Sequence, residues 1–138
     1  IRQCIDVIGV ERIDHGINIL EDIVLCETAR TRHIGLTVCP ISTRWVAGSL
    51  KAAEIKRMLE LELPVTVHSD DPAYFGGYIT DNLIATQEAV GLSLQEMLQL
   101  QCNAIEISWA SPIVRANLID ELEYFSARRC PEVNSVTP

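Results

Sequence analysis

The sequence has few basic residues and no long apolar run, and each absence excludes a class of protein. Lys and Arg number 11 against 19 Asp and Glu, which gives a formal net charge of −8. Such a balance provides no basic stripe, so we expect no nucleic acid polymer as a partner. No apolar run approaches the roughly 20 residues that span a membrane, and the first residues do not resemble a signal peptide. We therefore expect a cytoplasmic protein without a membrane partner.

Cysteine pairs with metal-binding or redox spacing are also missing. The chain has an odd number of cysteines and no Cys-x-x-Cys pair, which suits reduced thiols that serve as small core residues. The five are Cys4, Cys26, Cys39, Cys102 and Cys130.

The overall composition is that of an ordinary globular protein, with 48% hydrophobic and 22% charged residues. Its 138 residues are enough for one domain with a sizeable core.

Three short strand-like runs alternate with helical stretches. The runs cover residues 12–14, 36–39 and 65–68. Helical crossovers between them imply parallel pairing, because a tight hairpin cannot join parallel neighbours. The sequence therefore predicts an α/β fold with about three parallel strands, flanking helices and C-terminal helices. Three strands leave two open sheet edges and the chain begins without methionine, so we expect the C-terminal part of a longer polypeptide.

Periodicity and capping residues predict the helices. Ala52, Ile55 and Leu59 form one apolar stripe, and Ser93 with Glu96 has the spacing of a capping box. The predicted helices cover 1–8, 21–32, 51–61 and 81–90, with further helices starting at 93 and at Ser111-Pro112; a loop is expected from Pro40 to Ser49. We expect one domain over residues 1–127 and a flexible tail over 128–138.

Polar residues follow the end of each predicted strand. They are His15, the segment Pro40–Thr43, and the neighbouring Asp70 and Asp71. In α/β sheets and barrels this edge holds the active site. Adjacent carboxylates repel each other, and a metal cation or a ligand donor relieves that repulsion. Two plainer interpretations stay open: the acids form a solvated turn, and the histidine is structural.

These strand-end segments carry a resemblance to a known family. Arg-Ile-Asp-His-Gly at 12–16, Cys-Pro-Ile-Ser at 39–42 and Ser-Asp-Asp-Pro at 69–72 resemble, in order and spacing, the C-terminal half of the adenosine/adenine deaminase family of metal-dependent amidohydrolases. The run Pro72–Tyr78 more specifically resembles the adenine deaminase branch. The resemblance covers about residues 1–128.

The resemblance implies a fold, a reaction and roles for three residues. The fold is the C-terminal part of a (β/α)8 TIM barrel, and the reaction is the hydrolytic conversion of adenine, a small-molecule purine substrate, to hypoxanthine and ammonia with one Zn²⁺ ion. By position, Asp70 resembles the metal-ligating aspartate, Asp71 the carboxylate that bonds the purine ring nitrogen, and His15 the catalytic histidine that orients or polarises the attacking water.

Several family residues have no counterpart in this chain. The His-x-His pair, the third metal histidine and the proton-shuttling glutamate belong to the N-terminal half of the barrel, and one ligand cannot hold a catalytic zinc ion. We therefore expect this fragment alone to be inactive and to need the missing N-terminal half as its partner; an oligomer is also compatible with the sequence.

Other functions and residue roles stay open. An adenosine deaminase is the nearest alternative, and a non-catalytic binding module or split-barrel subunit is an alternative of another class. The zinc deaminases with His-x-Glu and Pro-Cys-x-x-Cys motifs are excluded, because neither motif occurs. Thr43 stands where the adenine branch often has asparagine. His68 either fills the interior or reaches the metal shell, and the aromatic residues of the 72–78 run form either a lid or a hydrophobic plug.

Overall fold

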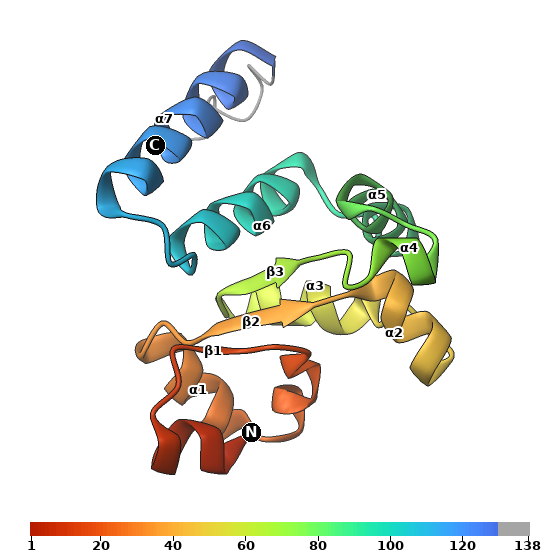
Figure 1. The fold of residues 1–138 in the computed structure, drawn as a ribbon, viewed down its shortest axis with the longest axis vertical. Helices are drawn as coiled ribbons and strands as arrows, with labels where there is room; N and C mark the ends of the chain where they lie inside the picture. Colours follow the sequence, from red (N-terminus) through yellow and green to blue (C-terminus); the bar gives the residue numbers. More distant parts are fainter. Residues whose placement is uncertain (130–138) are drawn as a thin grey trace.

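A three-stranded parallel sheet lies at the centre of the molecule (Figure 1). The structure is a computed structural model, and it describes residues 1–129. The strands are β1 (Arg12–Ile13), β2 (Gly35–Val38) and β3 (Val65–Val67), in the spatial order β1-β2-β3. Leu36 of β2 pairs with Ile13 on one side and with Val65 on the other. The three strands predicted from the sequence are confirmed, each to within about one residue.

Helices make every connection between the strands and form the whole C-terminal part. The π-helix η1 precedes β1; η2, a 3-10 helix, and α1 connect β1 to β2; α2 and α3 connect β2 to β3; four helices follow β3. Their bounds are η1 (Cys4–Ile8), η2 (Gly16–Glu21), α1 (Ile23–Thr31), α2 (Pro40–Ala47), α3 (Ala52–Glu60), α4 (Pro72–Phe75), α5 (Ile79–Val90), α6 (Leu94–Glu106) and α7 (Pro112–Arg129).

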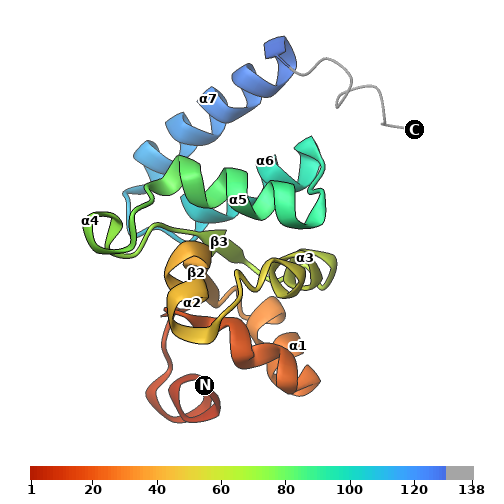
Figure 2. The same ribbon diagram turned by 90° about the vertical axis from the view of Figure 1, so that its right-hand side faces the viewer.

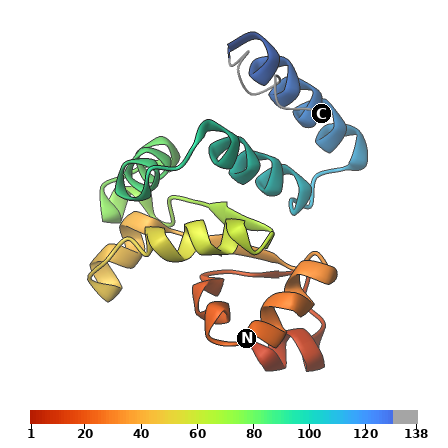
Figure 3. The same cartoon turned by 180° about the vertical axis from the view of Figure 1, so that it is seen from behind.

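The helices lie mainly on one side of the sheet and beyond β3. Seen from behind, α1 and α3 cover one face of the sheet (Figure 3). Helix α6 packs along β3, and α7 extends beyond α6 at the end of the molecule opposite the N-terminus (Figures 1 and 2). Among residues 1–129, no helix combines the length and the apolarity that crossing a membrane requires.

The main hydrophobic core fills the space between the sheet and the helices. Strand residues Leu36 and Val65 are fully buried there against Ile55 and Met58 of α3. Met58 completes the apolar stripe of α3 at helical spacing from Ile55, and Leu59, which the sequence pattern assigned to that stripe, is only partly buried. The stripe explains why α3 packs on this face of the sheet.

The other face of the sheet carries polar and small side chains. Successive strand residues point to opposite faces, so the neighbours of the core residues project away from α1 and α3. The residues of this second face are Arg12 in β1 and Asp14 after it, Gly35 and Thr37 in β2 and Cys39 after it, and His68 after β3. A Cβ at Gly35 would lie 2.5 Å from Ile107 Cδ1, so glycine is needed where the end of α6 meets β2.

One predicted helix boundary and one predicted loop are corrected by the structure. The segment after Pro40, predicted as a loop to Ser49, forms helix α2, because proline is well suited to the first helical position and Gly48 ends the helix in a left-handed conformation. Helix α1 begins at Ile23 rather than Glu21, because the Asp22 carboxylate caps it by accepting from two backbone amides.

The C-terminal helices agree with their predicted start signals. Ser93 and Glu96 form the predicted capping box of α6, and Pro112 opens α7. Helix α7 continues to Arg129, so the first two residues of the predicted 128–138 tail are helical. The remaining residues of that tail, Cys130 included, lie outside the described residues.

Candidate active site

A cavity of about 410 Å³ opens at the carboxyl ends of the three strands. All three strand ends contribute to it, and the end of α6 closes one side. The lining residues are Arg12, Asp14, His15, Thr37, Cys39, His68, Ser69, Asp70, Ala104, Ile107 and Ser108. The cavity therefore lies at the edge of the sheet where the sequence placed the candidate residues.

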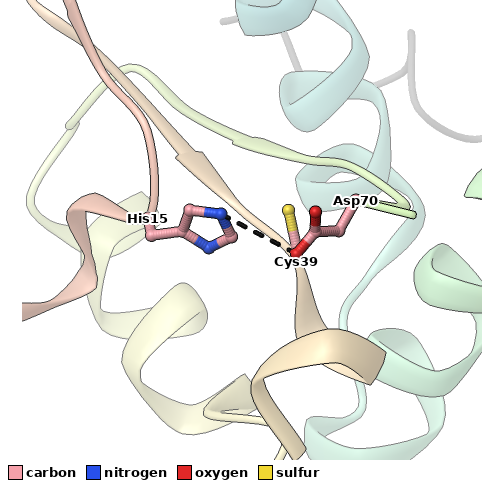
Figure 4. A group of neighbouring side chains, drawn as sticks. All are labelled: His15, Cys39 and Asp70. Carbon is pink, nitrogen blue, oxygen red and sulfur yellow. Dashed lines mark ion pairs between the residues drawn. The ribbon is translucent and has the colours of Figure 1, made fainter. Parts of the chain in front are cut away.

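His15 and Asp70 face each other across the end of β2 (Figure 4). His15 follows β1 and Asp70 follows β3, and their side chains bring Nε2 and Oδ2 to 3.8 Å. The histidine side chain is 56% exposed and the aspartate side chain 32% exposed, so the pair can still be reached from the cavity. Two residues 55 positions apart in the chain thus meet at one point.

Both residues of this pair have a left-handed backbone. The φ angle is +55° at His15 and +60° at Asp70. Positive φ is uncommon outside glycine, although His and Asp tolerate it better than most residues. Such conformations concentrate at functional sites, because the local strain persists only where the fold imposes it. The backbone thus turns each side chain from its strand end toward the other.

A hydrogen-bonded group holds the backbone of His15. The amide of His15 donates to Thr37 Oγ1 at 3.3 Å, and Thr37 Oγ1 donates to Asp14 Oδ1 at 3.1 Å. Arg12 Nε also donates to Asp14 Oδ1, at 3.1 Å. Thr37 is buried on the polar face of β2 and was not among the residues expected at the site.

Ser42 makes a short hydrogen bond to Asp70. Its hydroxyl donates to Oδ2 at 2.6 Å, and the serine is only 3% exposed. Ser42 stands in the first turn of α2, the helix that replaces the predicted loop. The sequence marked Ser42 as part of a motif, but its contact with Asp70 depends on that helix.

Cys39 brings a third potential ligand atom into this part of the cavity. Its Sγ, a ring nitrogen of His15 and a carboxylate oxygen of Asp70 all lie within 4.8 Å of one another (Figure 4). Burial, and then the charge of Asp70, raise the pKa of the Cys39 thiol to about 11. A protonated thiol is a poor metal ligand, so the proximity of Cys39 is best explained by core packing.

The four cysteines within the described residues are all free, as predicted.

The Asp70 carboxylate fits one position of a zinc site, with the His15 imidazole beside it. Imidazole nitrogen and carboxylate oxygen are both ordinary zinc ligands, and zinc takes three or more protein ligands in catalytic sites. Of the described residues, only the group of His15, Cys39 and Asp70 gathers three potential ligand atoms. A complete zinc site therefore needs further ligands from outside residues 1–129.

His68 lines the cavity but does not belong to the group formed by His15, Cys39 and Asp70. Its Nε2 lies 2.7 Å from Thr66 Oγ1, on the polar face of β3. Burial, and then the positive charge of Arg12, lower the pKa of the His68 imidazole. The structure therefore favours the interior role that the sequence left open for this histidine.

Asp71 occupies a different place from Asp70. It is the N-cap of α4, and its Oδ1 accepts a hydrogen bond from the Tyr74 amide at 3.1 Å. It is exposed and does not line the cavity. The structure thus brings His15 and Asp70 together and leaves Asp71 on the rim. Tyr74 and Tyr78, which follow Asp71 closely in the chain, are 80% and 66% exposed.

A family comparison agrees with the strand-end motifs. The model of the adenosine deaminase family matches residues 1–125. This chain belongs to the adenosine deaminase family. The resemblance inferred from the sequence is thereby confirmed, and the three parallel strands are part of the (β/α)8 barrel of these amidohydrolases.

Curated relatives within the family are named as deaminases. The chain is 42% identical over 125 residues to an adenine deaminase of Hahella chejuensis, covering 89% of this chain and 37% of that protein. It is 48% identical over 109 residues to an adenine deaminase of Marinomonas, covering 78% and 32%. An uncharacterized deaminase of Schizosaccharomyces pombe is 43% identical over 128 residues, covering 92% and 38%.

Solved structures give the same picture. The adenine deaminase of Arthrobacter aurescens superposes with a TM-score of 0.84 at 38% identity, covering 91% of this chain and 39% of that one. An amidohydrolase of Burkholderia ambifaria, solved with bound Zn, has a TM-score of 0.78 at 21% identity over 91% and 37% and supports the fold alone. The chain therefore spans between 32% and 39% of the length of these proteins.

Proposed function

We propose that this chain supplies one side of the active site of a zinc-dependent adenine deaminase. In the full-length protein, that enzyme hydrolyses adenine to hypoxanthine and ammonia. The observation that carries the proposal is the pairing of His15 Nε2 with Asp70 Oδ2 at 3.8 Å in an open cavity at the strand ends. The adenine deaminases among the relatives support the choice of substrate.

Asp70 is the residue of this chain that would hold the zinc ion. A carboxylate is a hard, anionic oxygen ligand, and the Asp70 side chain reaches the cavity from the bend that follows β3. When bound, zinc acts as a Lewis acid that lowers the pKa of water to about 7 and so makes a nucleophile available near neutral pH. We propose that the rest of the barrel contributes the other ligands and the glutamate that moves protons.

His15 orients the attacking water and stabilises charge in the transition state. Its imidazole stands in the cavity beside Asp70. The hydrogen bond from the His15 amide to Thr37 holds the backbone that carries this imidazole. As the oxygen attacks purine C6, its electron pair forms the new C–O bond and negative charge moves to the ring nitrogen, where a proton compensates it. A fixed N–H group close to the attacking oxygen holds that oxygen in line with C6 and lowers the energy of the transition state. This role is electrostatic, and His15 forms no covalent bond to the purine.

Asp71 recognises the purine ring from the rim, and its replacement tests this role. One carboxylate oxygen caps α4, which leaves the other to accept from a ring N–H. Asn caps a helix as well as Asp does but lacks the charge. Asp71→Asn should therefore lower kcat/KM for adenine by about 10- to 100-fold, the worth of one hydrogen bond to a charged group, with an unchanged melting temperature. Steady-state kinetics with unchanged kcat/KM would remove Asp71 from the binding site.

The substrate assignment is tested by an ammonia-release assay on the full-length protein with zinc. We expect faster release from adenine than from adenosine, because the proposal assigns the site to a free base without a ribose. The reverse order would assign the protein to adenosine. A protein that holds zinc and releases ammonia from neither purine would support a non-catalytic binding module instead.

A further inference from the structure

We propose that Ser42 is a positioning residue of this active site and that its hydroxyl sets the orientation of the Asp70 carboxylate. The inference rests on the function proposed above and deepens it, because it names a group that prepares the metal-ligating aspartate. Ser42 itself touches neither the metal nor the purine in this scheme. It acts only through the carboxylate to which it donates.

The contact between Ser42 and Asp70 is short and buried on the serine side. At 2.6 Å it lies in the range of a charge-assisted O–H···O⁻ bond, which is roughly twice as strong as a neutral one. Ser42 is 3% exposed, so water does not compete well for its hydroxyl. The bond fixes one of the two carboxylate oxygens.

Fixing Oδ2 determines where the other oxygen of Asp70 points. The same Oδ2 also lies 3.8 Å from His15 Nε2, so both neighbours act on one oxygen. With Oδ2 held on this side, the side-chain torsions of Asp70 are restricted and Oδ1 has one preferred direction. A preorganised ligand loses less conformational freedom when the metal binds.

The position of Ser42 is itself determined by a buried asparagine. Asn82 of α5 is fully buried, and its Oδ1 accepts a hydrogen bond from the Ile41 amide at 2.9 Å. Its amide group donates to Tyr78 O at 2.9 Å and to Gly77 O at 3.4 Å. Asn82 therefore ties the first turn of α2, which carries Ser42, to the start of α5.

The same junction is closely packed. A Cβ at Gly77 would lie 2.4 Å from Cδ1 of Ile41, so the Ile41 side chain packs directly against the backbone of Gly77. Hydrogen bonds and packing thus act together on the residue beside Ser42. This arrangement explains how Ser42 on α2, with its short side chain, reaches the Asp70 carboxylate after β3.

Ser42→Ala in the full-length protein tests the inference by zinc affinity. Loss of an outer partner of a metal ligand typically weakens metal binding or activity by about 10- to 100-fold, and we expect a loss of that size in competition with a chelator. The kcat for adenine should fall by a similar factor with little change in KM, because the purine contacts remain. Ser49→Ala, at an exposed serine after α2, is the matched control and should change neither quantity.

Two variants of equal shape separate the hydroxyl from the packing at this buried position. Thr and Val differ only in a hydroxyl against a methyl group. Ser42→Thr should keep the zinc affinity within about threefold of wild type, whereas Ser42→Val should lose as much as Ser42→Ala. This pair decides the question if Ser42→Ala does not fold, and a thermal melt of each variant shows whether it does.

The outcomes distinguish this inference from the proposed function. A wild-type full-length protein that binds no zinc would reject the proposed function itself. A wild-type protein that binds zinc and deaminates adenine, with equal zinc affinity in the Thr and Val variants, would overturn the role of Ser42 alone. Loss of zinc affinity confined to the variants without the hydroxyl supports the positioning role.

Discussion

Asp70→Ala in the full-length protein is expected to abolish stoichiometric zinc binding and to lower kcat/KM for adenine by about 10³-fold. A metal ion contributes several kcal/mol to the stabilisation of the transition state, and a loss of about 4 kcal/mol corresponds to that factor. The substitution also leaves the Ser42 hydroxyl without its acceptor and removes the carboxylate that lies 3.8 Å from His15 Nε2. Metal analysis of the purified protein and the ammonia-release assay measure the two effects.

Asp120→Ala is the control for this substitution. Asp120 is an exposed aspartate on α7, away from the cavity lining, so its loss should change neither zinc content nor activity. An Asp70→Ala variant with full zinc content and normal kcat/KM would remove this carboxylate from the metal site. It would also remove the basis for the role of Ser42.

His15→Asn should lower kcat by about 10²- to 10³-fold and leave KM for adenine and the zinc content nearly unchanged. The loss is the cost of removing one preorganised electrostatic group from the transition state. Asn is the suitable replacement because it tolerates the left-handed backbone that His15 adopts at φ +55°. A kinetic effect then reflects the imidazole and not a strained turn.

His33→Asn is the matched control for this second experiment. His33 is exposed and has nearly the same left-handed backbone, with φ +51°, and it does not line the strand-end cavity. Its replacement should leave kcat unchanged. Loss of zinc in His15→Asn would contradict the assignment, because it would make His15 a metal ligand rather than the residue that orients water.

The strands and most of the helices follow from local sequence patterns. The three predicted runs end within about one residue of β1, β2 and β3, because strands of a parallel sheet that are buried on both faces are short, continuous apolar or β-branched runs. The capping box at Ser93 also acts through local hydrogen bonds. Helix α2 was mistaken for a loop, since Pro40 both turns a chain and begins a helix.

The site was only partly predictable, because local sequence patterns reveal which residues follow a strand but not which distant residues contact them. His15 and Asp70 could be selected because each directly follows a strand, and parallel strands end at one edge of a sheet. The contribution of Ser42 and Thr37 could not be predicted from the sequence, because each acts through a contact with a residue more than 20 positions away. Neither the burial of a hydroxyl nor its partner is encoded in local periodicity.

The sequence by itself determined that this is an α/β chain with a histidine and an aspartate at the ends of its parallel strands. Its motifs also placed it in the adenosine deaminase family. Only the tertiary structure decided that these two side chains face each other, that Asp71 stays on the rim, and that Ser42 holds Asp70. The physical reason is that backbone patterns depend on near neighbours, whereas the direction of a side chain depends on the packing of elements far apart in the chain.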